Sequence, residues 1–245
     1  TAGPTSTPVA HWRFDEGAGS QAADSVGTGA PDGLLVGSTW STAATDGSAG
    51  SIEFDGFDDR VELGTYDLAP GPDGAVSLLF WFRADDFDTM DGRFLSKATG
   101  VQEDDHFWMV STLATSGTHR LRFRLKTAGA TSTLVASGGD LSPGVWYHAA
   151  AVYDGEAMRL YLNGVAVGSL PKTGAVSVDP AVDAWIGDQP GGTRPFDGLI
   201  DDVRVYDRAL DSTELLALLT GQGPCGLFGD DFETGDVSRW SAVIP

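Results

Sequence analysis

Residues 198–214, GLIDDVRVYDRALDSTE, decide the fold because they join a strand pattern to a helix pattern and place a carboxylate within the strand. Side chains of a strand alternate between its two faces, so a core that takes Val203 and Val205 should also take Asp201. A buried carboxylate is costly unless it is protonated, paired with a cation or bound to a metal. Because the chain has 35 acidic and 15 basic residues, a divalent cation is a candidate partner for Asp201.

The residues around Asp201 complete this local prediction. Asp202 lies on the opposite face of the strand together with Arg204, so we expect a surface ion pair between them. Asp211 precedes an apolar run and is followed three positions later by Glu214, which is the pattern of a capping box. We therefore predict one short helix over residues 211–219, packed on the edge of the fold.

The rest of the chain reads as strands separated by turns. Short runs rich in Val, Leu, Phe and Trp alternate with Gly, Asp and Pro, and the chain contains 33 glycines. Asn163-Gly164 suits a type I′ hairpin, which requires a positive φ at both central positions. The pattern predicts an all-β fold, in which two antiparallel sheets form a sandwich with one short peripheral helix.

The domain boundaries follow from changes in composition. Residues 1–8 are small, polar and proline-bearing, and we expect an N-terminal arm or linker there. Residues 9–220 form the predicted sandwich domain. Residues 221–245 hold Gly, Asp and isolated aromatics without a period, and are expected to form a non-globular tail. Cys225 in this tail is the only cysteine, so an internal disulfide is excluded.

The charge of the chain limits its partners. A formal net charge of −20 argues against nucleic acid and anionic membranes, because both bind clustered basic residues. No run of about 18 apolar residues is present, so we expect no membrane span. The opening residues TAGPTSTPVA resemble a mature terminus after signal removal. We therefore expect a protein that is secreted, extracellular or attached to the cell surface.

Four ordered stretches resemble a known family. Together they are similar to a bacterial laminin-G-like (LamG) domain of the concanavalin A-like lectin/glucanase superfamily, and the resemblance covers about residues 9–219. It implies a jelly-roll sandwich and implies no activity, because this superfamily hosts lectins, glycanases, lyases, adhesins and spacers. The stretches are HWRFDEGAGSQAADSVGTG at 11–29, SIEFDGFDDRVEL at 51–63, GVWYHAAAVYDGEAMRLYLNGVAVG at 144–168 and FDGLIDDVRVYDRALDSTE at 196–214.

The resemblance also implies a structural calcium ion between the acidic loop after the first strand and the last strand. Carried over by position, the carboxylate ligands are Glu16, Asp24 and Asp201. Backbone carbonyls such as those of Gly27 or Gly33 complete the six to eight oxygens that calcium takes. The alternative is that Asp201 accepts hydrogen bonds from loop amides and binds no metal.

The sequence offers little support for catalysis. Superfamily glucanases place two glutamates around an aspartate on one strand, and no Glu-x-Asp-x-Glu spacing exists here. Related lyases use histidine, tyrosine and arginine on the concave face. His106, His119 and His148 lie near aromatic residues, but no lyase motif surrounds them. We predict that the chain is not an enzyme.

Residues 119–126, HRLRFRLK, form the one basic feature of this acidic chain. Strand periodicity places four basic side chains on one face, namely those of Arg120, Arg122, Arg124 and Lys126. This basic stripe can bind an acidic polysaccharide or an acidic patch on another copy. Alternatively, its side chains pair with acidic residues of neighbouring strands or protect an edge.

Two functions remain in view. The first is a non-catalytic extracellular module for binding or adhesion, stabilised by calcium and contacting a glycan or a surface protein. The alternative is a structural subunit of a self-assembling extracellular filament or sheath. In that case the N-terminal arm or the C-terminal tail adds a strand to the next copy, giving a homo-oligomer or homopolymer.

Overall fold

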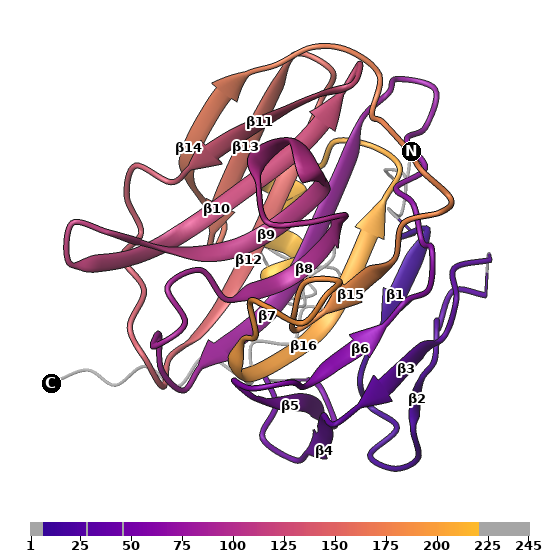
Figure 1. Cartoon of the computed structure of the whole chain (residues 1–245), viewed down its shortest axis with the longest axis vertical. Coiled ribbons are helices and arrows are strands. Elements are labelled where there is room, and N and C mark those ends of the chain that lie inside the picture. Colours follow the sequence, from indigo (N-terminus) through magenta and orange to yellow (C-terminus); the bar gives the residue numbers. More distant parts are fainter. Residues whose placement is uncertain (1–6, 28, 46, 221–245) are drawn as a thin grey trace, which may run out of the picture.

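The computed structural model describes residues 7–27, 29–45 and 47–220, which form two antiparallel sheets packed face to face (Figure 1). The first sheet has the order β14-β13-β12-β7-β16-β5-β4, with β1 also paired to β16. Its strands are β1 (Ala10–Trp12), β4 (Thr39–Ser41), β5 (Ser51–Asp55), β7 (Val76–Ala84), β12 (Trp146–Tyr153), β13 (Ala157–Leu162), β14 (Val165–Pro171) and β16 (Asp197–Tyr206).

The second sheet has the order β11-β10-β9-β8-β15-β6-β3-β2. A short 3-10 helix, η1 (Glu103–Asp105), precedes β9. The strands are β2 (Gln21–Ala22), β3 (Gly33–Val36), β6 (Arg60–Glu62), β8 (Arg93–Ala98), β9 (His106–Thr115), β10 (Thr118–Thr127), β11 (Ala130–Val135) and β15 (Ala184–Ile186). The predicted all-β jelly-roll sandwich of two antiparallel sheets is therefore confirmed.

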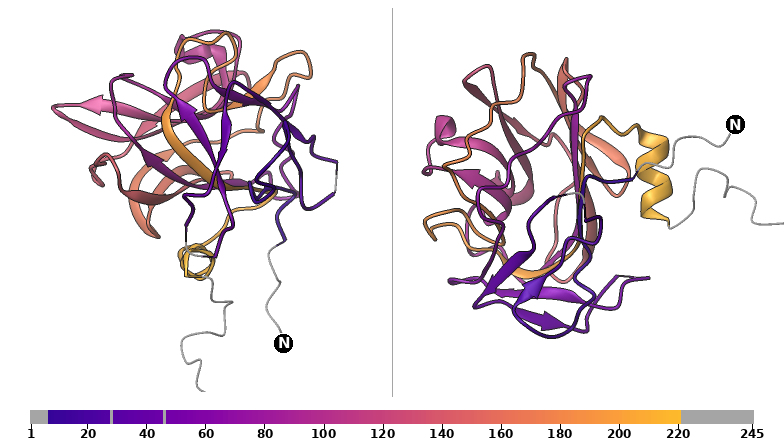
Figure 2. Two further views of the ribbon diagram at one scale, coloured as in Figure 1. Left: turned by 90° about the horizontal axis from the view of Figure 1, so that it is seen from below. Right: turned by 90° about the vertical axis from the view of Figure 1, so that its right-hand side faces the viewer.

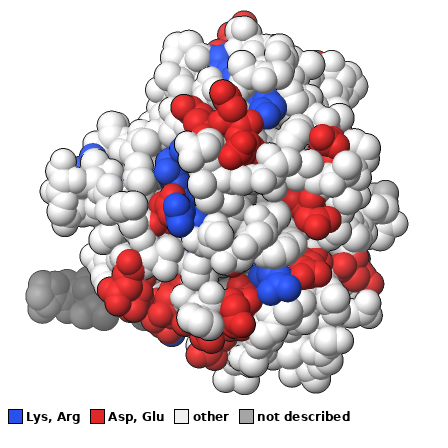
Figure 3. All heavy atoms as spheres, viewed as in Figure 1, with Lys and Arg blue, Asp and Glu red and all other residues white. Residues whose placement is uncertain are grey.

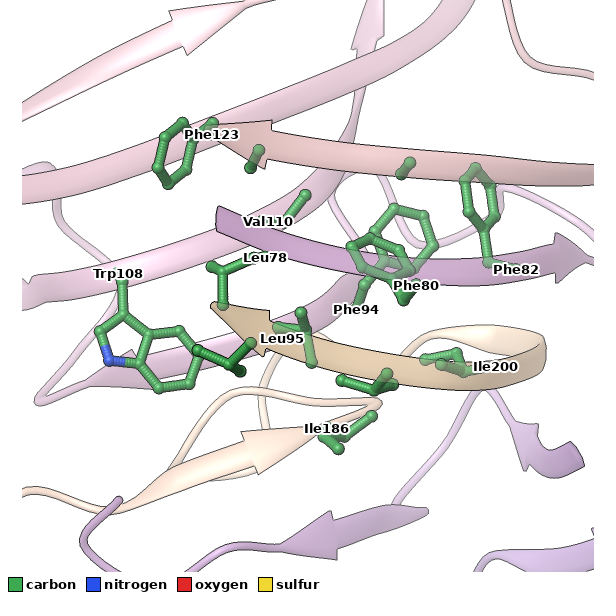
Figure 4. Packing of buried hydrophobic residues seen from close by; sticks show 14 of the residues in the cluster. Leu78, Phe80, Phe82, Phe94, Leu95, Trp108, Val110, Phe123, Ile186 and Ile200 are labelled. Atoms are coloured by element: carbon green, nitrogen blue, oxygen red, sulfur yellow. The ribbon is translucent and has the colours of Figure 1, made fainter. Parts of the chain in front are cut away.

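The main core lies between the two sheets, as strand alternation predicts. Phe80 and Phe82 of β7 point toward Phe94 of β8, at ring-centroid distances of 5.0 and 4.3 Å (Figure 4). Trp108 and Phe123 extend the same layer, and both are almost completely buried. Burying an aromatic or large aliphatic side chain contributes about 1.5–3 kcal/mol, so this layer holds the sheets together.

A single α-helix, α1 (Ser212–Leu219), packs on the outer face of the first sheet within the described part of the chain (Figure 2). Leu215 inserts among apolar side chains of β7, β12 and β16. The side chain of Asp211 accepts hydrogen bonds from the amides of Thr213 and Glu214 at 2.8 and 2.9 Å. The predicted peripheral helix and its capping box are thus confirmed, but the helix packs on the face of the sheet over β7, β12 and β16 and not on the edge of the fold.

The hairpin between β13 and β14 also has the predicted turn. Asn163 and Gly164 have φ values of 50° and 77°, as a type I′ turn requires. The Asn163 side chain accepts a hydrogen bond from the amide of His148 at 2.8 Å, which ties the turn to β12.

Several predictions fall outside the described residues. The first six residues of the N-terminal arm and the whole tail 221–245, with Cys225, are among them, so the domain boundaries stay predictions. Among the described residues, no helix is long and apolar enough to cross a membrane.

Candidate functional site

The position of Asp201 depends on a β-bulge that the sequence did not reveal. Asp201 pairs with Trp81 of β7, but the register shifts by one residue before Arg204. Asp202, inside the bulge, has a left-handed φ of 53°. The extra residue changes the alternation, so Val203 joins the core between the sheets while Asp201 lies on the outer face of the first sheet.

The prediction that Asp201 shares a face with Val203 and Val205 is therefore wrong, although its burial is confirmed at 0% exposure. Residues of the segment 42–50 contact its carboxylate. The hydroxyl of Thr45 donates to Asp201 Oδ2 at 3.1 Å, and the Thr45 amide lies 3.5 Å from the same oxygen.

Ser48 connects Asp201 to a second carboxylate. Its hydroxyl oxygen lies 3.2 Å from Asp201 Oδ1, 3.0 Å from Asp15 Oδ1 and 3.0 Å from the Gly50 carbonyl oxygen. A serine hydroxyl carries one proton and can donate to one of these three acceptors. The site therefore has more hydrogen-bond acceptors than donors. A proton on one carboxylate, or a bound cation, would satisfy the remaining acceptor oxygens.

The two carboxyl groups differ in their electrostatic environment. Burial, reinforced by the nearby charge of Asp202, raises the pKa of Asp201 to about 7. No ion pair joins Asp201 to a basic side chain in the part of the chain that the structure describes. Burial also works to raise the pKa of Asp15, but hydrogen bonds from the Ala49 amide and Arg13 outweigh it and lower that pKa. Asp15 is thus fully ionised at neutral pH.

Asp202 forms the ion pair that the sequence predicted. Arg204 Nη2 lies 2.8 Å from Asp202 Oδ2, and both side chains are half-buried. His11 Nε2 contacts the other carboxylate oxygen of Asp202 at 2.6 Å, which links β1 to the bulge of β16.

A pocket of about 520 Å³ opens beside these groups. It lies over the outer face of the first sheet and reaches the C-terminal end of α1. Among the described residues that line it, Trp81 is the one aromatic residue, and Leu218 and Leu219 of α1 add apolar side chains. The charged and polar lining includes Arg13, Asp15, Ser48, Asp202 and Arg204.

The structure places the predicted calcium ligands in different surroundings. Glu16 Oε1 accepts a hydrogen bond from the Ala23 amide at 2.9 Å. Asp24 accepts from the amides of His11 and Gly27 at 2.9 and 3.0 Å. Gly33 lies in β3, where it pairs with Ala22.

Glu16, Asp24 and Asp201 do not form a compact group. In the described residues, one set of three acidic, histidine or cysteine side chains brings its ligand atoms within 4.8 Å of one another, and it consists of Asp55, Asp58 and Asp59. The residue that does approach Asp201 is Asp15, directly before Glu16, through their shared contact with Ser48.

The oxygen atoms around Asp201 are suitable ligands for a hard cation. Asp15, Asp201, Ser48 and Thr45 offer carboxylate and hydroxyl oxygens and no nitrogen or sulfur atom. Calcium prefers such oxygen ligands. The excess of acceptors around Ser48 is the feature of this structure that a bound cation would satisfy.

The basic stripe alternates with the core as predicted, but it does not form an open row of cations. Leu121, Phe123 and Leu125 are fully buried, and the basic side chains lie on the opposite face of β10. Arg120 pairs with Asp140 at 2.6 Å, and the buried Arg122 pairs with Asp91 at 2.9 Å.

The other half of the stripe contacts uncharged groups. Arg124 Nε donates to the hydroxyl of Thr133 at 3.1 Å. Lys126 Nζ lies 4.6 Å from the ring centroid of Phe107. The side of the molecule that carries the second sheet shows more acidic than basic side chains (Figure 3). Within the described residues, Arg120 and Arg122 thus pair with acidic side chains, whereas Arg124 and Lys126 form no ion pair.

Two of the three candidate histidines are inside the protein. His106 and His148 are 0% and 2% exposed, and burial lowers the pKa of each to about 4. His119 stacks on Phe87 with a centroid distance of 4.5 Å. At neutral pH the two buried imidazoles are uncharged.

Comparison with known proteins places this geometry in a family. The family model described as the concanavalin A-like lectin/glucanases superfamily (Laminin_G_3) matches residues 54–216, more than half of the chain. No curated protein sequence gives a significant match. The structure is similar to domain 4 of AbnA, an extracellular GH43 arabinanase from Geobacillus stearothermophilus, in complex with arabinotriose. The TM-score is 0.64 at 20% identity, covering 87% of this chain and 98% of that one.

Two other solved structures share the fold at low sequence identity. The SAP-like pentraxin from Limulus polyphemus has a TM-score of 0.53 at 22% identity, covering 69% of this chain and 81% of that one. The botulinum neurotoxin serotype D ligand-binding domain, in complex with N-acetylneuraminic acid, has a TM-score of 0.64 at 13% identity, covering 89% of this chain and 51% of that one. The family match and the two-sheet architecture together show that the chain belongs to the concanavalin A-like lectin/glucanase superfamily.

Proposed function

We propose that the chain is a non-catalytic carbohydrate-binding module that is stabilised by calcium and works outside the cell. The proposal that the module binds carbohydrate rests on the similarity of its fold to AbnA domain 4, which extends over 98% of that domain. That domain was solved with arabinotriose. A module of the same extent and fold is a reasonable scaffold for a sugar site.

The surroundings of the histidines support a binding role over catalysis. A general acid or base has to reach its substrate and works best with a pKa near the operating pH. His106 and His148 are buried and have pKa values of about 4, so both conditions fail. The sequence also lacks the alternating carboxylates of the superfamily glucanases.

Calcium is proposed at Asp201 and Asp15, with hydroxyl oxygens from Ser48 and Thr45. This revises the ligand set of Glu16, Asp24, Gly27 and Gly33, since Asp15 shares Ser48 with Asp201. When bound, calcium neutralises the two carboxylates. It also interacts with the acceptor oxygens that the single hydroxyl proton of Ser48 leaves without a donor. These ligands would join Thr45 and Ser48 to β16 on the outer face of the first sheet. Extracellular fluids hold enough calcium for sites of modest affinity, which agrees with the proposed location.

Binding and turnover can be tested on the same polysaccharides. Affinity electrophoresis of the full chain in native gels cast with arabinan, xylan or mixed-linkage β-glucan measures retention in the presence of calcium. A reducing-end assay on each polymer measures cleavage. We expect retention by at least one polymer and no release of reducing ends. No retention by any glycan would reject the binding module, and release of reducing ends would reject its non-catalytic character.

The calcium part has a separate test. We expect the melting temperature of the chain at pH 8 to rise on addition of calcium chloride and to return on addition of EGTA, because a ligand that binds only the folded state stabilises it. Magnesium at the same concentration is the control, since it requires tighter octahedral geometry. An unchanged melting temperature in millimolar calcium would remove the ion from the proposal.

A further inference from the structure

We infer that the pocket between Trp81 and the end of α1 is the binding site for a short neutral sugar. This inference rests on the proposed glycan-binding function and adds the place and the chemical class of the ligand. The pocket volume of about 520 Å³ falls within the range of roughly 300–1,000 Å³ that is typical of small-molecule sites.

Trp81 supplies the aromatic surface of the pocket, and Leu218 and Leu219 of α1 also line it. Trp81 is half-buried in β7 and held edge-on against His148 at a centroid distance of 5.2 Å. Its indole N–H donates to no described residue, whereas the indole N–H groups of Trp12 and Trp40 each donate to a backbone carbonyl. A fixed ring with an unused donor can pack against the apolar face of a sugar ring and bind one of its hydroxyl groups.

The charged groups of the pocket balance one another. Arg13 Nε lies 2.8 Å from Asp15 Oδ2, and Arg204 Nη2 lies 2.8 Å from Asp202 Oδ2. Each guanidinium carries five N–H donors, so several remain for ligand oxygens while each carboxylate can accept further hydroxyl protons. Sugar hydroxyl groups act as donors and acceptors at once, and they match such pairs.

The same pairing disfavours an acidic sugar. A uronate carboxylate would have to compete with Asp15 and Asp202 for the two arginines, and with Asp15 and Asp201 for the proposed calcium ion, inside a chain with a net charge of −20. The basic stripe offers no better alternative, because Arg120 and Arg122 already pair with Asp140 and Asp91. A neutral sugar is therefore the ligand that this pocket fits.

The test compares Trp81→Ala with a matched tryptophan outside the pocket. Trp185→Ala serves as the control, because Trp185 is also half-buried but lies in β15 of the second sheet, against Arg60. Arg13→Gln is a second probe of the pocket that should fold in any case, since the Arg13 side chain is 54% exposed. The calcium-dependent shift of the melting temperature in each variant shows that the fold and the neighbouring carboxylates are intact.

Affinity electrophoresis is then run with neutral arabinan, xylan and mixed-linkage β-glucan and with anionic alginate and polygalacturonate. We expect the wild type to bind a neutral polymer, Trp81→Ala to weaken that binding at least tenfold, Arg13→Gln to weaken it severalfold, and Trp185→Ala to leave it unchanged. A tenfold loss is what removing an aromatic anchor typically produces.

The outcomes separate the two proposals. If the wild type binds a glycan and both pocket variants bind it equally well, the sugar site lies elsewhere and only this inference fails. If binding depends on Trp81 but is confined to alginate or polygalacturonate, the assignment to a neutral sugar fails. If the wild type binds no polysaccharide, the proposed function fails and this inference fails with it.

Discussion

Replacing Asp201 with asparagine should stabilise the calcium-free protein at alkaline pH. An unperturbed aspartate has a pKa of about 3.9, whereas burial and Asp202 raise the pKa of Asp201 to about 7. Each pH unit of this difference corresponds to about 1.4 kcal/mol, so ionising Asp201 lowers the free energy of unfolding by about 4 kcal/mol. Asparagine has the same shape and no charge to bury.

The pH dependence has a definite sign. Because the folded state binds the proton of Asp201 more tightly than the unfolded state, the contribution of Asp201 to wild-type stability without metal should fall as the pH rises from about 4 to about 7 and then stay low. Below pH 4 the carboxyl is protonated in both states, so Asp201→Asn should equal the wild type there. At pH 8 the variant should be more stable by up to about 4 kcal/mol.

Calcium should reduce the difference in stability between the two proteins at pH 8. It binds the ionised carboxylate, so a calcium concentration of 100 times the dissociation constant stabilises the wild type by about 2.7 kcal/mol, and Asp201→Asn loses much of this gain. Urea denaturation of both proteins at pH 4, 6 and 8, each with EGTA and with calcium, measures all of these differences. The difference between the variant and the wild type at each pH removes the contributions of other buried carboxyl groups, such as Asp188, whose pKa is also raised by burial.

One result would refute this reasoning. If Asp201→Asn destabilises the protein equally at pH 8 with EGTA and with calcium, the carboxylate is stabilised by protein groups alone. In that case the surroundings of Asp201 neither raise its pKa nor require a cation.

Three further results are expected. The imidazole of His148 should titrate near pH 4 in a two-dimensional NMR experiment, because burial lowers its pKa, and a midpoint near 6.5 would show that it is solvated. Asn163→Ala should lower the free energy of unfolding by about 1–2 kcal/mol, because alanine tolerates the left-handed φ of 50° less well than asparagine does. Asn163→Gly should lower it less, and urea denaturation of both variants measures the difference. Asp91→Asn should cost about 3–5 kcal/mol, because it leaves the buried Arg93 without its 3.0 Å ion pair. Asp140→Asn, at a more exposed pair, should cost less than about 1 kcal/mol, and equal losses would contradict this difference.

The sequence predicted the burial of Asp201 but not the face on which it lies. A period of two is reliable only while every residue of a strand is paired, and the bulge at Asp202 adds one residue to β16. A glycine or asparagine at that position would have indicated a left-handed conformation. Aspartate adopts it here without a distinct local signal, so the switch of faces could not be read in advance.

The partners of Asp201 depend on contacts between distant parts of the chain. Thr45 and Ser48 lie 156 and 153 positions away from it, in a segment without periodicity. The resemblance pointed to the element DEG, after the first strand, for the predicted calcium site. It selected Glu16, whereas the backbone turns Asp15 toward Ser48. Alternation, by contrast, placed the basic stripe correctly, because β10 is regularly paired along its whole length with β9 or β11.

Binding of a cation between Asp15 and Asp201 is tested most directly by crystals grown with calcium and examined by anomalous scattering. We expect one strong peak that lies about 2.3–2.6 Å from carboxylate oxygens of both residues. A peak held instead by Asp55, Asp58 and Asp59, or no peak beside an ordered and buried Asp201, would contradict the proposed site.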